Sequence, residues 1–339
     1  MKIFGKKVNW FIGLFIITSI ALIMDFAQSA FAAQPSTKTP VILDTDIGDD
    51  IDDTWALGLL LKSPELDVKL IVGDYGKPLY RTKIIAKFLE TVGRTDIPIG
   101  MGIDTSVHGG GPQSDWVKDY NINKYPGKIY PDGVQAIIDT IMNSPEKVIL
   151  VCIGPLPNIA AALEREPRIA EKARFVGMHG SVRKGYGGSK DISAEWNVKA
   201  DVKACQKVFT AQWDMLITPL DTCGVVDLFG EQYKKVRDSG DKIARTIIEN
   251  YKIWSAANKT PKAAQERSST LFDTVAVYLA INTDLVKVET LGIRVDDKGF
   301  TVIDENAKKV QCATEWKDLN GFRDFLVNRL TGGNNLKQI

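Results

Sequence analysis

The sequence predicts an α/β fold, in which one domain is built on a mostly parallel, open β-sheet flanked by helices. Short apolar runs alternate with helical patterns along the chain, and the runs end in Gly or Pro. Strand followed by helix, repeated, is the pattern of βαβ units, whose strands lie parallel. No low-complexity segment or long charge run marks a linker in residues 33–339, so we expect a single domain there.

The individual elements follow from this alternation in chain order. The first three apolar runs predict strands, and a helical pattern follows each of them: strands at 40–48, 66–76 and 147–157, with helices at 52–63, 81–93 and 158–167. Two later apolar runs, 173–180 and 214–224, predict further strands. The stretch 103–133 is polar, aromatic and rich in Gly and Pro, and a loop of that length favours a lid or binding loop.

The N-terminal residues 1–32 have the features of a secretory signal peptide. Three lysines precede the apolar run 11–24, and small residues then lead to an expected cleavage after Ala32. The alternative is an uncleaved membrane anchor, but this run is shorter than the roughly 20 residues that span a bilayer. We therefore expect residues 33–339 to be exported, periplasmic or secreted, without a stable membrane anchor.

The overall composition excludes several classes of protein. With 44% hydrophobic and 25% charged residues, the chain is neither largely disordered nor a multi-span membrane protein. Its 43 basic and 42 acidic residues give no excess of positive charge to bind nucleic acid. Four widely spaced cysteines make a zinc site improbable, and both a disulfide and buried free thiols remain open: Cys152, Cys205, Cys223 and Cys312.

Six aspartates lie within residues 44–53, directly after the first predicted strand. In open α/β sheets, this edge of the sheet is where ligands bind. Carboxylates packed this closely repel one another, so they either take up protons or share a cation such as Ca²⁺ or Mg²⁺. The alternative is a solvated acidic loop whose aspartates favour the start of the following helix.

The acid cluster and three later motifs resemble the inosine-uridine-preferring nucleoside hydrolase family. The matching stretches follow the family's order over nearly all of the chain after the signal: residues 42–57, 151–163, 194–201 and 268–280. This resemblance implies a Rossmann-like nucleoside hydrolase domain, a bound Ca²⁺, and a small nucleoside as substrate. It further implies that a metal-bound water, activated by an aspartate, cleaves the N-glycosidic bond and releases free base and ribose.

The resemblance also implies roles for individual residues. Asp46 would act as general base, and the Ca²⁺ ligands would be Asp46, Asp53, Asp273 and the backbone carbonyl of Ile153. The ribose hydroxyls would be held by Asp52, Glu195 and Asn197. Further substrate contacts are expected from Asp74 near the sugar, His108 at the pocket mouth, and an aromatic base platform for which Trp254, Trp196 and Trp116 are candidates.

The sequence departs from the family pattern at four places. The segment from Asp46 to Asp53 is two residues longer than usual, so Asp49 or Asp50 could supply the carboxylate assigned to Asp52. Asp74 and Ser189 each replace an Asn, the second near the 5′ end of the ribose. Phe272 stands where many members carry the His proposed to protonate the leaving base, and the other histidine, His179, is a weaker candidate than His108.

Two alternative functions remain. Phe272 and Ser189 are compatible with an exported, non-catalytic protein that binds nucleosides or ribose. A Mg²⁺-dependent phosphohydrolase of the haloacid dehalogenase type also begins with a strand followed by Asp-x-Asp, but Gly48 stands where that family carries Thr or Val. The sequence does not determine the preferred base, and it is compatible with a homo-oligomer.

Overall fold

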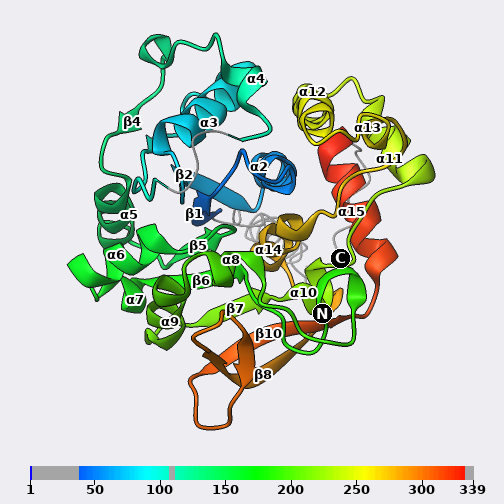
Figure 1. Cartoon of the computed structure of the whole chain (residues 1–339). Helices are drawn as coiled ribbons and strands as arrows, with labels where there is room; N and C mark the ends of the chain where they lie inside the picture. The colour runs from blue at the N-terminus through cyan, green and yellow to red at the C-terminus, as the bar shows by residue number, and fades with distance from the viewer. Residues whose placement is uncertain (2–37, 107–110, 333–339) are drawn as a thin grey trace. The chain divides into compact units, whose positions relative to one another are not determined.

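The computed structural model describes residues 38–106 and 111–332, together with Met1 (Figure 1). The predicted signal peptide beyond Met1 and His108 in the long loop lie outside the described residues. No helix in the described part of the chain is long and apolar enough to cross a membrane.

The described residues form a sheet of ten strands in the order β4-β3-β2-β1-β5-β6-β7-β10-β8-β9. The strands are β1 Thr39–Thr45, β2 Leu66–Gly73, β3 Ile99–Gly100, β4 Ile129–Tyr130, β5 Val148–Cys152, β6 Ala173–Met178, β7 Met215–Thr218, β8 Val286–Val295, β9 Thr301–Ile303 and β10 Lys309–Trp316. Pairing is parallel from β4 to β10, and β8 and β9 add antiparallel strands at one edge. The predicted mostly parallel α/β sheet is therefore confirmed.

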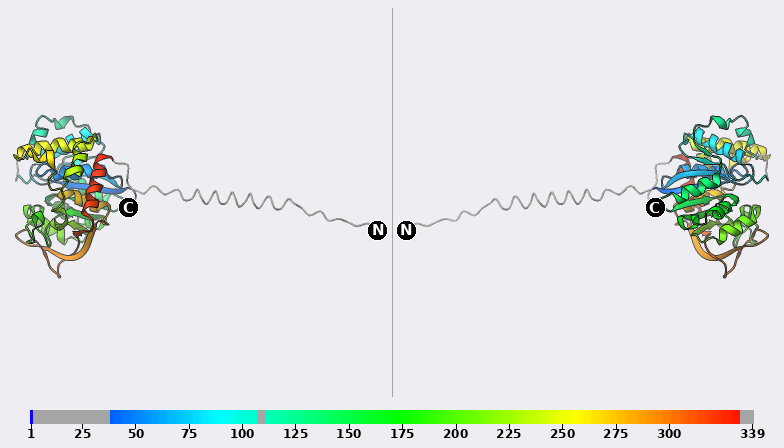
Figure 2. Two further views of the ribbon diagram at one scale, coloured as in Figure 1. Left: turned by 90° about the vertical axis from the view of Figure 1, so that its right-hand side faces the viewer. Right: turned by 90° about the vertical axis from the view of Figure 1, so that its left-hand side faces the viewer.

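Helices cover both faces of this sheet, and each face has its own apolar core (Figures 1 and 2). One core lies against α2 Asp52–Leu61, α3 Pro78–Val92, α10 Leu220–Cys223, α11 Gly230–Arg237, α12 Lys242–Ala257, α13 Ala263–Glu266, α14 Phe272–Ile281 and α15 Leu319–Thr331. The other lies against α5 Gly133–Met142, α6 Pro157–Arg165, α7 Ile169–Lys172 and α9 Val202–Thr210. Because both faces are covered, the central strands are apolar on both sides.

Strand β1 shows how this arrangement positions a site. Val41 and Leu43 contribute to one core and Ile42 to the other, since side chains alternate along a strand. The chain continues from β1 to β2 on one side, and β5 pairs with β1 on the other. The acidic loop after β1 thus lies where the strand order reverses, the place at which such sheets bind ligands.

Two expectations from the sequence need correction in detail. The stretch 103–133 is not one continuous loop, because it contains α4 Ser114–Val117, the 3₁₀ turn η1 Ile122–Lys124 and strand β4. The predicted strand 214–224 ends at Thr218, and the short helix α10 follows it.

All four cysteines are buried free thiols, which is the second of the two alternatives that the sequence left open; none of them forms a disulfide.

Candidate active site

An open cavity of about 460 Å³ lies at the carboxyl ends of the central strands. Its described lining residues are mostly acidic or aromatic: Asp46, Asp49, Asp50, Asp52, Asp53, Ile153, Met178, Tyr186, Glu195, Trp196, Asn197, Phe272 and Asp273. The cavity therefore brings together residues from all four motifs that the sequence analysis singled out.

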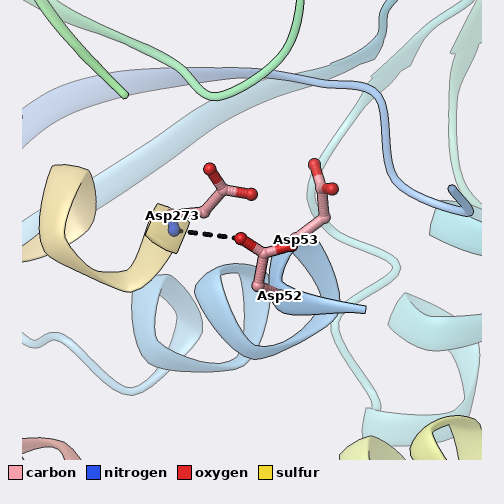
Figure 3. A group of neighbouring side chains, drawn as sticks. All are labelled: Asp52, Asp53 and Asp273. Carbon is pink, nitrogen blue, oxygen red and sulfur yellow. Dashed lines mark hydrogen bonds between the residues drawn. The ribbon is translucent and has the colours of Figure 1, made fainter. Parts of the chain in front are cut away.

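Three carboxylates at the N-terminal ends of two helices form an acid triad (Figure 3). Asp52 and Asp53 open α2, Asp273 is the second residue of α14, and each offers an oxygen within 4.8 Å of the others. The backbone N–H of Asp273 donates to Asp52 Oδ2 at 3.2 Å, and the Thr45 hydroxyl donates to Asp53 Oδ1. The positive ends of both helices favour acidic side chains at these positions.

The acid triad is chemically suited to a cation. All three side chains are at most 3% exposed, and burial raises the pKa of each carboxyl well above its usual range, with neighbouring aspartates adding to the rise. A cation held between them would offset both the burial and the mutual repulsion. Closely spaced carboxylate oxygens are the donors that hard ions such as Ca²⁺ and Mg²⁺ prefer, so these residues could hold a metal ion.

Asp46 lies beside the acid triad and against the segment that follows β5. A Cβ placed on Gly154 would come within 2.9 Å of the Asp46 backbone nitrogen and of its Oδ1, so this close approach requires glycine. Burial raises the pKa of Asp46 to about 7, while the charge of Arg81 opposes the rise. The neighbouring Ile153 carbonyl faces Asn197, whose Nδ2 donates to it at 3.3 Å.

The extended loop between Asp46 and Asp52 is held by Arg81, a residue that the sequence analysis did not single out. Arg81 Nη2 donates to Asp49 Oδ2 at 2.7 Å, and its Nη1 and Nε donate to the carbonyls of Ile47 and Tyr75 at 3.0 Å each. The arginine is only 1% exposed. Asp49 is thus paired with Arg81, whereas Asp52 joins the acid triad. No spacing rule links this helix residue to the acidic loop.

Glu195 and Asn197 also line the cavity. Glu195 caps α8 Trp196–Ala200, accepting from the backbone N–H of Asn197 at 2.8 Å and of Gly180 at 2.9 Å. Burial raises the pKa of the Glu195 carboxyl to about 7. Asn197 Nδ2 also donates to the Met178 carbonyl at 3.0 Å, so both side chains are tied to the ends of β5 and β6.

Three aromatic residues border the cavity: Tyr186, Trp196 and Phe272. The rings of Tyr186 and Phe272 meet edge to face, with centroids 6.1 Å apart and planes at 83°. The Tyr186 hydroxyl accepts a hydrogen bond from the Trp196 backbone N–H at 2.9 Å. Tyr186 begins the 3₁₀ turn η2 Tyr186–Gly188, and the sequence analysis did not single out this residue.

Two other predicted substrate residues lie near the cavity without being among its described lining residues. Trp254 Nε1 donates to the Asp49 carbonyl at 2.8 Å and so supports the extended loop. Asp74 follows β2, and neither carboxylate oxygen has a hydrogen-bonding partner among the described residues. Burial, with Asp44 adding to it, raises the pKa of Asp74 well above its usual range.

The remaining histidine and tryptophan candidates are also not among the described lining residues of the cavity. His179 is buried, its Nε2 lies 3.0 Å from the Gly154 carbonyl oxygen, and burial lowers its pKa to about 4. Trp116 is buried and its Nε1 donates to Glu249 at 3.1 Å. The structure therefore gives both residues packing roles.

The fold and the site together define a class of protein: an α/β protein with an open cavity, lined by carboxylates, at the switch point of a mostly parallel sheet. The chain belongs to the inosine-uridine preferring nucleoside hydrolase family, whose sequence pattern matches residues 41–324. It is accordingly an N-glycosyl hydrolase that cleaves the N-glycosidic bond of ribonucleosides. This membership disagrees with the phosphohydrolase alternative.

Known proteins similar to this chain carry consistent names. Probable uridine nucleosidase 2 of Arabidopsis thaliana is 26% identical over 83% of this chain and 90% of the relative. Pyrimidine-specific ribonucleoside hydrolase RihA of Citrobacter koseri is 28% identical over 86% of this chain and 97% of the relative. The solved purine-preferring ribonucleoside hydrolase from Gardnerella vaginalis superposes with a TM-score of 0.73 at 25% identity, covering 87% of this chain and 98% of that chain.

Proposed function

We propose that this hydrolase depends on Ca²⁺ and uses Asp46 as the general base. The observation that carries the proposal is the acid triad Asp52, Asp53 and Asp273 in the same cavity as Asp46. All four side chains are buried, at most 5% exposed.

The donor set favours Ca²⁺ as the ion. The proposed ligands are Asp46, Asp53, Asp273 and the Ile153 carbonyl. Asp52 belongs to the acid triad, and its carboxylate is close enough to Asp53 and Asp273 to contact the same ion. No His or Cys is among the described lining residues, which disfavours zinc, and Ca²⁺ tolerates irregular sets of oxygen ligands better than Mg²⁺ does. When bound, the ion would lower the pKa of a water molecule that it holds and stabilise nearby negative charge.

Residues of the chain accept the proton of the water, bind the ribose and stabilise the charge that develops on it. Asp46 accepts a proton from the attacking water, since its carboxylate lines the same cavity as the proposed metal ligands. Asp52, Glu195 and Asn197 hold the ribose hydroxyls, and the surrounding carboxylates stabilise the positive charge that develops on the sugar ring. Because these side chains are buried, their electrostatic interactions with the sugar are stronger than they would be in water.

A panel of purine and pyrimidine ribonucleosides tests this function. Protein loaded with Ca²⁺ should release free base and ribose from at least one of them, and a chelator should stop the release until Ca²⁺ is restored. Tight binding without turnover in calorimetry would instead support a nucleoside-binding protein. Full activity in the presence of the chelator would exclude the metal-dependent mechanism.

We also propose that residues 1–32 direct export and are removed, so that residues 33–339 act in the periplasm or outside the cell. The support is the order of the lysines, the apolar run and the small residues before Ala32. Intact mass measurement of the protein recovered from cell fractions should find an N-terminus at Ala33. Recovery of the full-length chain in the membrane fraction would favour the uncleaved anchor.

A further inference from the structure

The residue roles assigned so far include no hydrogen-bond donor to the nucleobase as it departs. When the bond between C1′ and the base nitrogen breaks, its electron pair stays on the base, and a nearby hydrogen-bond donor stabilises that charge. Phe272, directly before Asp273, offers only an aromatic ring. Among the described residues that line the cavity, Tyr186 carries the only hydroxyl group.

The surroundings of Tyr186 hold that hydroxyl in place and leave its proton available. Its ring rests edge to face on Phe272, and its oxygen accepts the Trp196 backbone N–H at 2.9 Å. The described residues provide no acceptor for the Tyr186 O–H. Asn197, the only amide side chain among the described lining residues, already donates from its Nδ2 to the carbonyls of Met178 and Ile153.

We propose that Tyr186 is a catalytic residue that donates a hydrogen bond to the departing nucleobase. The inference rests on the proposed function. Water attacks C1′ and gives one proton to Asp46, while the electron pair of the C1′–N bond passes to the base, whose nitrogen or carbonyl oxygen accepts the Tyr186 O–H. The base then takes its proton from solvent, and Asp46 releases the proton it accepted.

The placement of Tyr186 agrees with donation of a hydrogen bond rather than transfer of its proton. Burial, with Glu195 adding to it, raises the pKa of the phenol above its usual value, so the hydroxyl stays protonated. The aromatic pair borders the acid triad through Phe272 and Asp273, which places the hydroxyl and the water-activating acids around one cavity.

The variant Y186F tests the proposal, because it removes the hydroxyl and keeps the ring. Two kinds of substrate are compared: uridine and inosine, whose bases are poor leaving groups, and p-nitrophenyl riboside, whose nitrophenolate leaves without a donor. We expect kcat for the nucleosides to fall by about 10²-fold. The kcat for p-nitrophenyl riboside should change by no more than about threefold, because no protonation or hydrogen bond is needed there.

The remaining outcomes are decisive as well. An equal fall on both kinds of substrate would overturn the proposal, because the hydroxyl would then act on the sugar or on the structure. Unchanged rates on both would also overturn it. The control Y120F removes a hydroxyl bonded to Glu90 outside the cavity and should leave all rates unchanged. If the wild-type protein cleaves neither kind of substrate, the proposed function fails rather than the role of Tyr186.

Discussion

Two regions of the cavity differ in how the fold holds them. The acid pole, defined as Asp46, Asp52, Asp53 and Asp273, is buried and comes from a strand end and two helix starts. The aromatic mouth, defined as Tyr186, Trp196 and Phe272, includes two exposed residues, Tyr186 at 44% and Trp196 at 46%. The comparison suggests that the framework fixes the bond-breaking chemistry, whereas the mouth can vary with the substrate.

We expect the largest effect, a loss of kcat, when Asp46, the proposed general base in the acid pole, is replaced. The change Asp46→Asn keeps the size of the side chain but removes the proton acceptor, so kcat should fall by about 10³-fold or more. Circular dichroism should show an unchanged fold. Near-normal kcat in this variant would assign the base to another residue.

The support of the acid pole should matter for stability. The change Arg81→Met leaves Asp49 without its ion-pair partner and the Ile47 and Tyr75 carbonyls without a donor. We expect a loss of about 3 kcal/mol in the free energy of unfolding, measured in urea. Arg81→Lys, which keeps the charge but not the fork of donors, should lose less. An equal loss in both variants would contradict this expectation, because it would show that keeping the positive charge recovers none of the lost stability.

The pH dependence of stability tests Glu195, the buried acid that lines the cavity outside the acid pole. In the folded protein the pKa of Glu195 is about 7, against a usual 4.5, so the folded state binds the proton more tightly than the unfolded chain. The resulting stability is fully present below pH 4.5 and is lost as pH rises through 7. In metal-free protein, the decline in the free energy of unfolding between pH 5 and pH 8 should be smaller in Glu195→Gln than in the wild type, by up to about 3 kcal/mol. Urea unfolding of both proteins at the two pH values measures this difference. An unchanged decline in the variant would mean that other acids cause it.

The aromatic mouth should give the smallest effect on stability. Because the Trp196 side chain is 46% exposed, Trp196→Ala should lower the free energy of unfolding by no more than about 1 kcal/mol. Its KM for nucleosides should rise, since the ring lines the cavity. A large loss of stability with unchanged KM would reverse the contrast between the two regions.

The same contrast explains how far the sequence alone could predict the site. The strand 40–48 and the helix pattern at 52–63 place the acids at a switch point, and the structure brings Asp273 to them from far along the chain. Periodicity cannot show that Arg81 turns inward, because a single cation in an amphipathic helix is usually solvated. Tyr186 was missed because its glycine-rich turn follows no repeating pattern.

The central claim is that the acid pole binds a metal ion on which turnover depends. Calcium titration of metal-free protein by calorimetry, with nucleoside cleavage measured in the same samples, tests this most directly. We predict one Ca²⁺ per chain, turnover that rises in proportion to occupancy, and loss of both in Asp53→Asn and Asp273→Asn. Turnover by metal-free protein, or unchanged Ca²⁺ binding in both variants, would contradict the account.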